Sequence, residues 1–92
     1  MTTTTDPDHT KTWNLRLDLF EEPEGTTSAH AVLDTGDGRL DSWTIAYRNP
    51  HDRPVPGIGD EYAAGRALRE LGQRLLDAGA VDAEENAHGR AR

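Results

Sequence analysis

The sequence predicts an α+β fold of two layers, in which a three-stranded antiparallel sheet packs on one long C-terminal helix. Three segments within residues 13–49 alternate between apolar and polar residues, which is the pattern of half-buried strands. Residues 58–78 instead carry apolar residues at helical spacing. Between these regions, residues 49–57 contain three prolines, which exclude a helix interior or an inner strand.

The first two expected strands each have one clearly apolar face. The strand at 13–20 has its inner face formed by Trp13, Leu15, Leu17 and Leu19. Pro23 and Gly25 then interrupt the alternation, as turn residues do. The strand at 27–35 carries small residues on its inner face, which would let a helix approach closely. A Gly36-Asp37-Gly38 turn joins it to the next strand in a hairpin.

The third expected strand, residues 39–49, is ambiguous because both of its faces carry apolar side chains. Either a bulge changes its register or both faces are covered. The single helix can cover only one side of the sheet. The other side would then expose a candidate interface formed by Phe20, Trp43, Ile45 and Tyr47, and an uncovered apolar sheet face is typical of a partner-binding surface.

The expected helix begins at Ile58 with two acidic residues, Asp60 and Glu61, in its first turn, where carboxylates favour the positive end of the helix dipole. Its apolar stripe consists of Ala64, Ala67, Leu68, Leu71, Leu75 and Ala78. We expect Gly79 to end the helix in a left-handed conformation. Gly72 lies near the stripe and is expected to permit close approach to the sheet.

Composition limits the chain to one small domain. The 92 residues include 15 Leu, Ile, Val or Phe and no Cys, so a large core, disulfides and thiolate chemistry are excluded. We expect a polar disordered tail over 1–12, the folded domain over 13–80 and a disordered or frayed tail over 81–92. The N-terminal segment lacks the pattern of a secretory signal. The expected location is therefore the cytoplasm, and no membrane span is predicted.

A set of residues in the connector and helix resembles one family. The set is Arg48-Asn49-Pro50, Asp52, Pro56-Gly57-Ile58-Gly59-Asp60-Glu61, Ala64, Arg66-Ala67-Leu68, Leu71 and Leu75-Leu76. It is similar to short actinobacterial proteins of unknown function, known chiefly from mycobacteria and streptomycetes, and the match runs from Trp13 to about Ala80. The resemblance implies a βββα domain like the double-stranded-RNA-binding fold without its first helix. It implies no activity, cofactor or functional residue.

Charge argues against nucleic-acid binding. The chain has 17 acidic and 10 basic residues, a net charge of -7, and residues 13–79 hold 12 acidic and 7 basic residues, a net of -5. Asp60 and Glu61 stand at the helix start, where an RNA-binding relative of this fold needs basic groups. Such a surface repels a phosphate backbone, so nucleic acid is an improbable partner.

No motif predicts a catalytic group, a cofactor or a metal site. The four histidines are scattered, and the only compact metal-ligand pair is His51-Asp52, whereas a zinc site needs three or four convergent ligands. One polar constellation surrounds the helix start: Arg48, Asn49, Asp52, Asp60 and Glu61. The favoured interpretation is structural, with Arg48 paired to an acid of the first helical turn. The alternative is a binding site.

The sequence therefore predicts a small acidic protein that is not an enzyme. Its expected role is a protein-interaction module that forms homo-oligomers through the open sheet face or edge, because so small a core barely offsets chain entropy. The alternative is a small-molecule binder or enzyme that uses the region of Arg48, Asp60 and Glu61. Nucleic-acid binding is the least favoured of the three functions.

Overall fold

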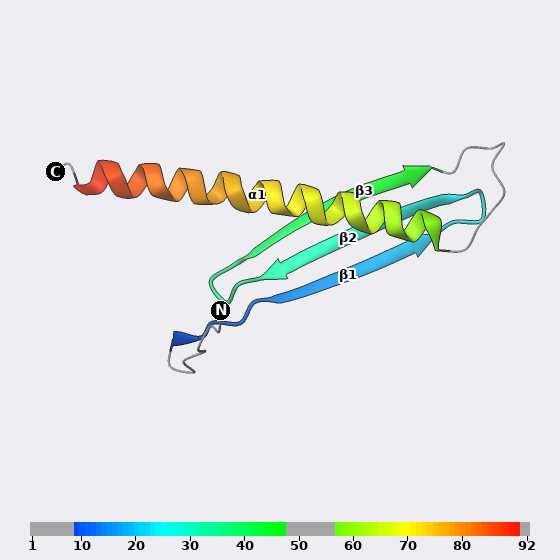
Figure 1. The fold of residues 1–92 in the computed structure, drawn as a ribbon, viewed down its shortest axis with the longest axis horizontal. Coiled ribbons are helices and arrows are strands. Elements are labelled where there is room, and N and C mark those ends of the chain that lie inside the picture. The colour runs from blue at the N-terminus through cyan, green and yellow to red at the C-terminus, as the bar shows by residue number, and fades with distance from the viewer. Residues whose placement is uncertain (1–8, 48–56, 91–92) are drawn as a thin grey trace, which may run out of the picture.

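The computed structural model describes residues 9–47 and 57–90, with side chains through residue 87. It contains three strands and one helix in the order β1 (Asn14–Glu21), β2 (Thr26–Asp34), β3 (Arg39–Tyr47) and α1 (Ile58–Arg90). The strands form one antiparallel sheet in the order β1-β2-β3, and α1 lies across one face of it (Figure 1). The predicted α+β, βββα fold is confirmed.

Two short turns join the strands. In the first, Gly25 N–H donates to Glu22 O at 3.0 Å, which closes a turn around Pro23, the residue whose ring presets the second position of such turns. Gly25 and Gly36 have φ of 97° and 87°, a conformation that glycine adopts without a Cβ clash. The second turn closes with Thr35 N–H donating to Gly38 O at 3.0 Å. The hairpin predicted at residues 36–38 is confirmed.

The register assigns every side chain to one of two faces. On β2, Thr27, Ala29, Ala31 and Leu33 are buried, while the alternate residues are only partly buried. Leu15, Leu17 and Leu19 of β1 lie opposite Leu33, Ala31 and Ala29 on the helix side. On β3, the helix side carries Leu40, Ser42, Thr44 and Ala46. The sheet therefore has one face made largely of small residues and one face that nothing in the described chain covers.

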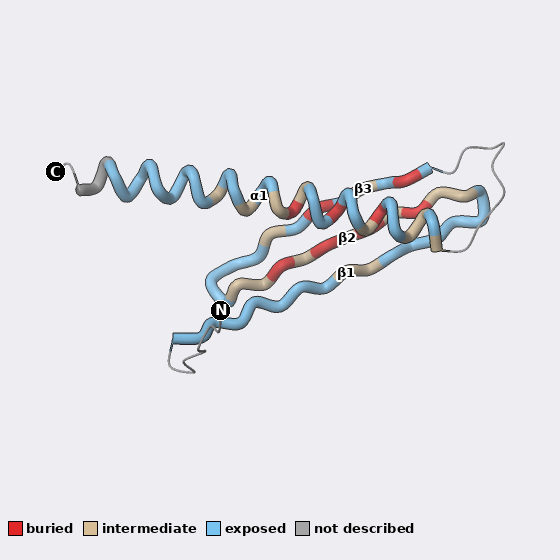
Figure 2. Tube along the Cα trace, in the orientation of Figure 1, coloured by how far each residue is buried: buried red, intermediate tan, exposed pale blue. Residues whose placement is uncertain are grey.

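The core is narrow because alanine dominates it. Its buried apolar residues are Ala29, Ala31, Leu33, Ala46, Ala63, Ala67 and Leu71. They lie on the middle of the sheet and on the first half of α1 (Figure 2). Alanine and serine bring the helix backbone close enough for side chains of β3 to reach it. Ser42 and Thr44 donate hydrogen bonds to the carbonyls of Ala67 and Ala63.

One of the two alternatives for the third strand is excluded. The pairing of β2 with β3 continues without interruption from Thr26–Tyr47 to Asp34–Arg39, so no bulge changes the register. Within residues 9–47 and 57–90 of one chain, nothing covers the second face, where Trp43, Ile45 and Tyr47 are exposed, and its cover by a partner stays a prediction. The physical reason is size, because the small side chains of β3 turn toward the helix and the large ones turn away.

The helix does not end where the sequence indicates. α1 continues through Gly79 to Arg90, and the glycines with positive φ are Gly25, Gly36 and Gly57 among the described residues. α1 therefore includes residues 81–90, where a disordered or frayed tail is expected, and the fraying of this segment stays a prediction. The C-terminal half of α1 runs past the sheet (Figure 1). The radius of gyration is 18.3 Å, against about 12 Å for a compact domain of this length.

The role expected for Gly72 is also wrong. A Cβ at Gly72 would meet nothing within 4 Å, and the same holds at Gly65 and Gly79. The close approach lies instead at Gly59, where a Cβ would stand 2.6 Å from Oγ1 of Thr27. The first turn of α1 therefore rests on β2 at a position where a larger residue does not fit.

Candidate functional site

The sheet face opposite α1 gathers the largest exposed apolar side chains of the strands. Phe20 is 45% exposed, Trp43 55%, Ile45 46% and Tyr47 75%. Phe20 lies opposite Ser28, which lies opposite Ile45, so the three strands contribute to one continuous surface. We call the four apolar residues the aromatic patch. It occupies the end of the sheet nearest the start of α1, because Phe20 is the second-last residue of β1 and Tyr47 is the last residue of β3.

A stack of rings orders the patch. The imidazole of His30 lies parallel to the indole of Trp43, with ring centroids 4.0 Å apart and planes 5° apart. Phe20 stacks on the indole at 5.8 Å and 24°. His30 and Trp43 face each other across β2 and β3. Hydrogen-bonded and non-hydrogen-bonded residue pairs alternate along the ladder, starting from the hydrogen-bonded Thr35–Gly38 pair. His30 and Trp43 therefore form a non-hydrogen-bonded pair, in which opposite side chains come closest.

Asp41 fixes the orientation of the imidazole. Nε2 of His30 hydrogen-bonds to Oδ2 of Asp41 at 2.9 Å. Asp41 is the diagonal neighbour of His30, two residues before Trp43 on β3, and such neighbours are within reach of long side chains. The imidazole therefore stacks on Trp43 through its ring face and hydrogen-bonds to Asp41 through Nε2. It contributes an ordered polar group beside the aromatic patch.

The other end of the same face is polar. Arg16 pairs with Asp18 at 3.0 Å between Nε and Oδ2, and Arg39 approaches Asp34 at 3.6 Å. Both pairs are solvent-exposed, so each contributes little to stability. The uncovered face is thus divided along its length into an apolar end and a charged end, which gives any partner on it a defined orientation.

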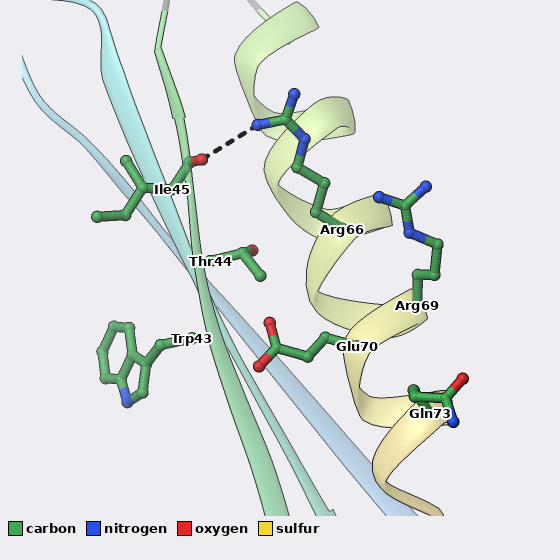
Figure 3. A pocket seen from close by; sticks show the side chains of 7 residues that line it. All are labelled: Trp43, Thr44, Ile45, Arg66, Arg69, Glu70 and Gln73. Atoms are coloured by element: carbon green, nitrogen blue, oxygen red, sulfur yellow. Dashed lines mark hydrogen bonds between the residues drawn. The ribbon is translucent and has the colours of Figure 1, made fainter. Parts of the chain in front are cut away.

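A hollow borders the patch at the free edge of β3. It is lined by Trp43, Thr44, Ile45, Arg66, Arg69, Glu70 and Gln73. In Figure 3, Trp43 and Ile45 lie on one side of β3, and the arginines, Glu70 and Gln73 come from α1 on the other. Nη1 of Arg66 donates to the carbonyl oxygen of Ile45 at 3.3 Å. The hollow therefore combines an aromatic wall, an open strand edge and two guanidinium groups.

The polar constellation predicted at the helix start can be located only in part. Arg48, Asn49 and Asp52 lie outside the described residues, as do His51 and most of the connector. Among the residues that the structure describes, Oδ1 of Asp60 is buried without a hydrogen-bond partner. The group that Asp60 influences is Glu21, at the end of β1. A side-chain hydrogen bond with Asp60, and then repulsion between the two carboxylates, raises the pKa of Glu21 above its ordinary value.

Neither metal ligation nor a membrane span emerges from the described part of the chain. Over residues 9–47 and 57–90, no three His, Asp or Glu side chains converge in a way that could hold a metal ion. The helix α1, searched over the same residues, lacks an apolar stretch long enough to cross a bilayer.

The sequence predicts the residues of the aromatic patch but not four residues close to it. These residues are His30, Glu21, Arg66 and Arg69, which the sequence does not link to the patch. For His30 a signal was available, because the Gly36–Gly38 hairpin turn determines which residue of β3 lies opposite it. For Glu21 and the arginines the missing information was where the helix lies on the sheet.

The chain is similar to proteins of known sequence over nearly its whole length. It is 40% identical over 80 residues to the uncharacterized protein Mb1767 of Mycobacterium bovis, which covers 87% of this chain and 84% of that protein. It is 35% identical over 85 residues to the uncharacterized protein Rv2632c of Mycobacterium tuberculosis, covering 91% and 90%. The crystal structure of Rv2632c superposes with a TM-score of 0.79 at 31% identity, covering 90% of this chain and 98% of the other.

The predicted resemblance to a mycobacterial family of unknown function is thereby confirmed, whereas the likeness to the double-stranded-RNA-binding fold stays a prediction. The family model described as Rv2632c-like matches residues 11–92, and the chain belongs to the Rv2632c-like family.

Proposed function

We propose that the chain is a non-enzymatic interaction module that self-associates through the uncovered sheet face. The observation that carries the proposal is the aromatic patch, Phe20, Trp43, Ile45 and Tyr47, whose members are each at least 45% exposed. Contiguous exposed apolar surface of this kind is typical of protein interfaces, and tryptophan and tyrosine are the side chains that contribute most to them.

The small core gives a physical reason for association. Within the described part of the chain, five of the seven buried apolar residues are alanine, so folding removes little apolar surface from water per residue. A domain of this size then gains little net stability from its own core. Covering the patch with a second copy would remove four large side chains from water in each subunit.

The geometry of the patch suits a two-fold arrangement. Its rings are ordered by stacking, since both Phe20 and His30 stack on Trp43, so little side-chain entropy is lost on association. The charged end of the face carries both signs, with Arg16 and Arg39 beside Asp18 and Asp34. If two copies pair these faces about a two-fold axis, with their strands antiparallel, the two aromatic patches meet at the centre. The charged end of each face then lies outside that apolar contact, at the solvated rim of the interface.

Sedimentation velocity of the full chain over a wide concentration range tests the proposal. The expected result is a concentration-dependent dimer that the Trp43→Ser/Tyr47→Ser double variant weakens at least about tenfold. Tyr62→Ser is the matched control, because Tyr62 is 62% exposed on α1 and outside the patch. Circular dichroism checks that each variant is folded.

Three results would contradict the proposal. A strict monomer at the highest concentration excludes self-association, and a dimer that Tyr62→Ser weakens as much as the patch variant places the contact elsewhere. A gel shift of single- or double-stranded RNA at low salt, abolished by the patch variant, would assign the face to nucleic acid instead.

A further inference from the structure

A second surface lies at the free edge of β3 and shares Trp43 and Ile45 with the aromatic patch. We propose that this edge binds an extended acidic peptide segment, which adds to the sheet as a fourth strand with acidic side chains toward α1 and apolar side chains toward the aromatic patch. The proposal rests on the open backbone groups of β3, on the two arginines above it and on the different chemistry of its two sides.

Among the described residues, no strand pairs with the outer hydrogen-bonding edge of β3. In the β2–β3 ladder, Thr35 and Gly38 form a hydrogen-bonded residue pair. From that pair onward, non-hydrogen-bonded and hydrogen-bonded pairs alternate, so Trp43 and Ile45 both belong to non-hydrogen-bonded pairs. Trp43 and Ile45 therefore direct their N–H and C=O groups away from β2. The contact from Arg66 to the carbonyl oxygen of Ile45, at 3.3 Å, confirms that this carbonyl faces outward. An edge of this kind is a template for an added strand.

The cations beside this edge lack acidic partners. Arg16, Arg39 and Arg74 each pair with a carboxylate, those of Asp18, Asp34 and Glu70. Within residues 9–47 and 57–87, no carboxylate pairs with Arg66, and Arg69 makes neither an ion pair nor a hydrogen bond. The whole chain carries seven more acidic than basic residues. Two guanidinium groups left without an acid in such a chain form a local positive site.

The two sides of β3 differ in chemistry, which sets the pattern of the peptide. Trp43 and Ile45 project toward the uncovered sheet face, and Arg66 and Arg69 come from α1 on the other side (Figure 3). Side chains of an added strand alternate between these sides. Two acidic residues separated by one residue on the added strand are about 6.8 Å apart. Arg66 and Arg69 are about 4.5 Å apart along the helix axis. The flexible arginine side chains can accommodate the difference between these two spacings.

Glu70 does not cancel this positive site. Its Oε1 lies 3.2 Å from Nη2 of Arg74, so its charge is matched by an arginine that does not line the hollow. The added strand would replace the contact from Arg66 to Ile45 by a backbone hydrogen bond. The freed guanidinium could then pair with a peptide carboxylate, a charge-assisted bond stronger than the bond to a neutral carbonyl.

Fluorescence anisotropy with a labelled peptide of alternating glutamate and valine tests the proposal on the full chain. We expect binding that the Arg66→Gln/Arg69→Gln double variant weakens about tenfold or more, since each charge-assisted contact contributes to affinity. Arg74→Gln is the matched control, because it removes an arginine of the same helix outside the hollow. Unfolding followed by circular dichroism verifies that the variants are folded.

Three further probes separate this mode of binding from others. A peptide of alternating lysine and valine should not bind, and N-methylation of alternate peptide amides should abolish binding while its charge is kept. Amide hydrogen exchange at Trp43 and Ile45 should slow when the peptide binds. The proposal is overturned if the lysine peptide binds as well as the glutamate peptide, or if the N-methylated peptide keeps full binding. It is also overturned if oligothymidine or inorganic phosphate at equal charge displaces the peptide.

Discussion

The hydroxyl of Ser42 on β3 donates a hydrogen bond of 2.7 Å to the carbonyl oxygen of Ala67 on α1. Thr44 repeats the contact one helical turn earlier, at 2.9 Å from the carbonyl of Ala63. Two residues along a strand advance about 6.8 Å and four along a helix about 6 Å, so the steps match when β3 and α1 run in opposite directions. These hydroxyls therefore fix the longitudinal position of the helix on the sheet.

Ser42→Ala should lower the free energy of unfolding by about 1 kcal/mol, the ordinary net worth of a buried hydrogen bond. Ser42→Val should cost more, about 1–3 kcal/mol, because Ser42 is 1% exposed and a larger branched side chain at a buried position overpacks its surroundings. Urea unfolding measures both. Ser28→Ala, on the uncovered face of β2, is the control and should be near neutral; an equal loss there would refute the role of the helix contact.

Gly59→Ala should destabilise the fold by about 1–3 kcal/mol, because its Cβ would stand 2.6 Å from Oγ1 of the buried Thr27. Gly65→Ala is the matched change where nothing lies within 4 Å, and it should stabilise the helix by about 0.5–1 kcal/mol. Thermal unfolding of the two variants gives the comparison. If both substitutions raise the melting temperature, the first turn of α1 does not rest on β2 as described.

The carboxyl pair of Glu21 and Asp60 should make stability depend on pH. Because Asp60 raises the pKa of Glu21 in the folded chain, the folded state holds a proton that the unfolded state loses at about pH 4. Stability then falls as the pH rises from the unfolded pKa through the raised folded pKa. Glu21→Gln should remove this loss and raise the melting temperature at neutral pH relative to wild type.

Melting curves from pH 3 to 8 measure that effect. Glu22→Gln is the control, since it removes the same charge one residue farther along and leaves the pair intact. A wild-type profile that matches the Glu21→Gln profile in shape would show that the two carboxylates do not interact in solution.

The stack of His30 on Trp43 should be measurable as a coupling energy. A double-mutant cycle with His30→Ala and Trp43→Ala should give about 0.5–1.5 kcal/mol, the range for aromatic pairs. The corresponding cycle between His30 and Tyr47, which lies four residues beyond Trp43 on β3, should give less than about 0.5 kcal/mol. Coupling of the same size in both cycles would mean that the variants disturb the strand and not the ring contact.

Much of the fold could be predicted because local patterns carry it. Alternation placed Leu15, Leu17 and Leu19 on the face that the structure turns toward α1, and the glycine-rich turn set the β2–β3 hairpin. Gly79 misled because a glycine at the end of an apolar stripe is typical of a helix terminus, whereas the polar residues beyond it continue the helix without needing a core. Propensity alone does not distinguish those two outcomes.

The candidate site was predictable only where it depends on one strand. Trp43, Ile45 and Tyr47 share a face through simple alternation, so the patch followed from sequence together with a single covering helix. The hollow at the β3 edge did not, because Arg66 and Arg69 reach Trp43 and Ile45 only after α1 is placed on the sheet. A salt-bridged helix face and a binding edge look alike in the sequence.

By itself the sequence determined the order of elements, the apolar face of each strand, the acidic balance and the absence of cysteine chemistry. Those properties depend on residue type and spacing, which are local. Tertiary structure alone decided the register of α1 on β3, the close contact of Gly59 with Thr27, the pairing of Glu21 with Asp60 and the exposure of two arginines beside a free strand edge. Each of these joins residues far apart in the chain, and only packing sets the distance between them.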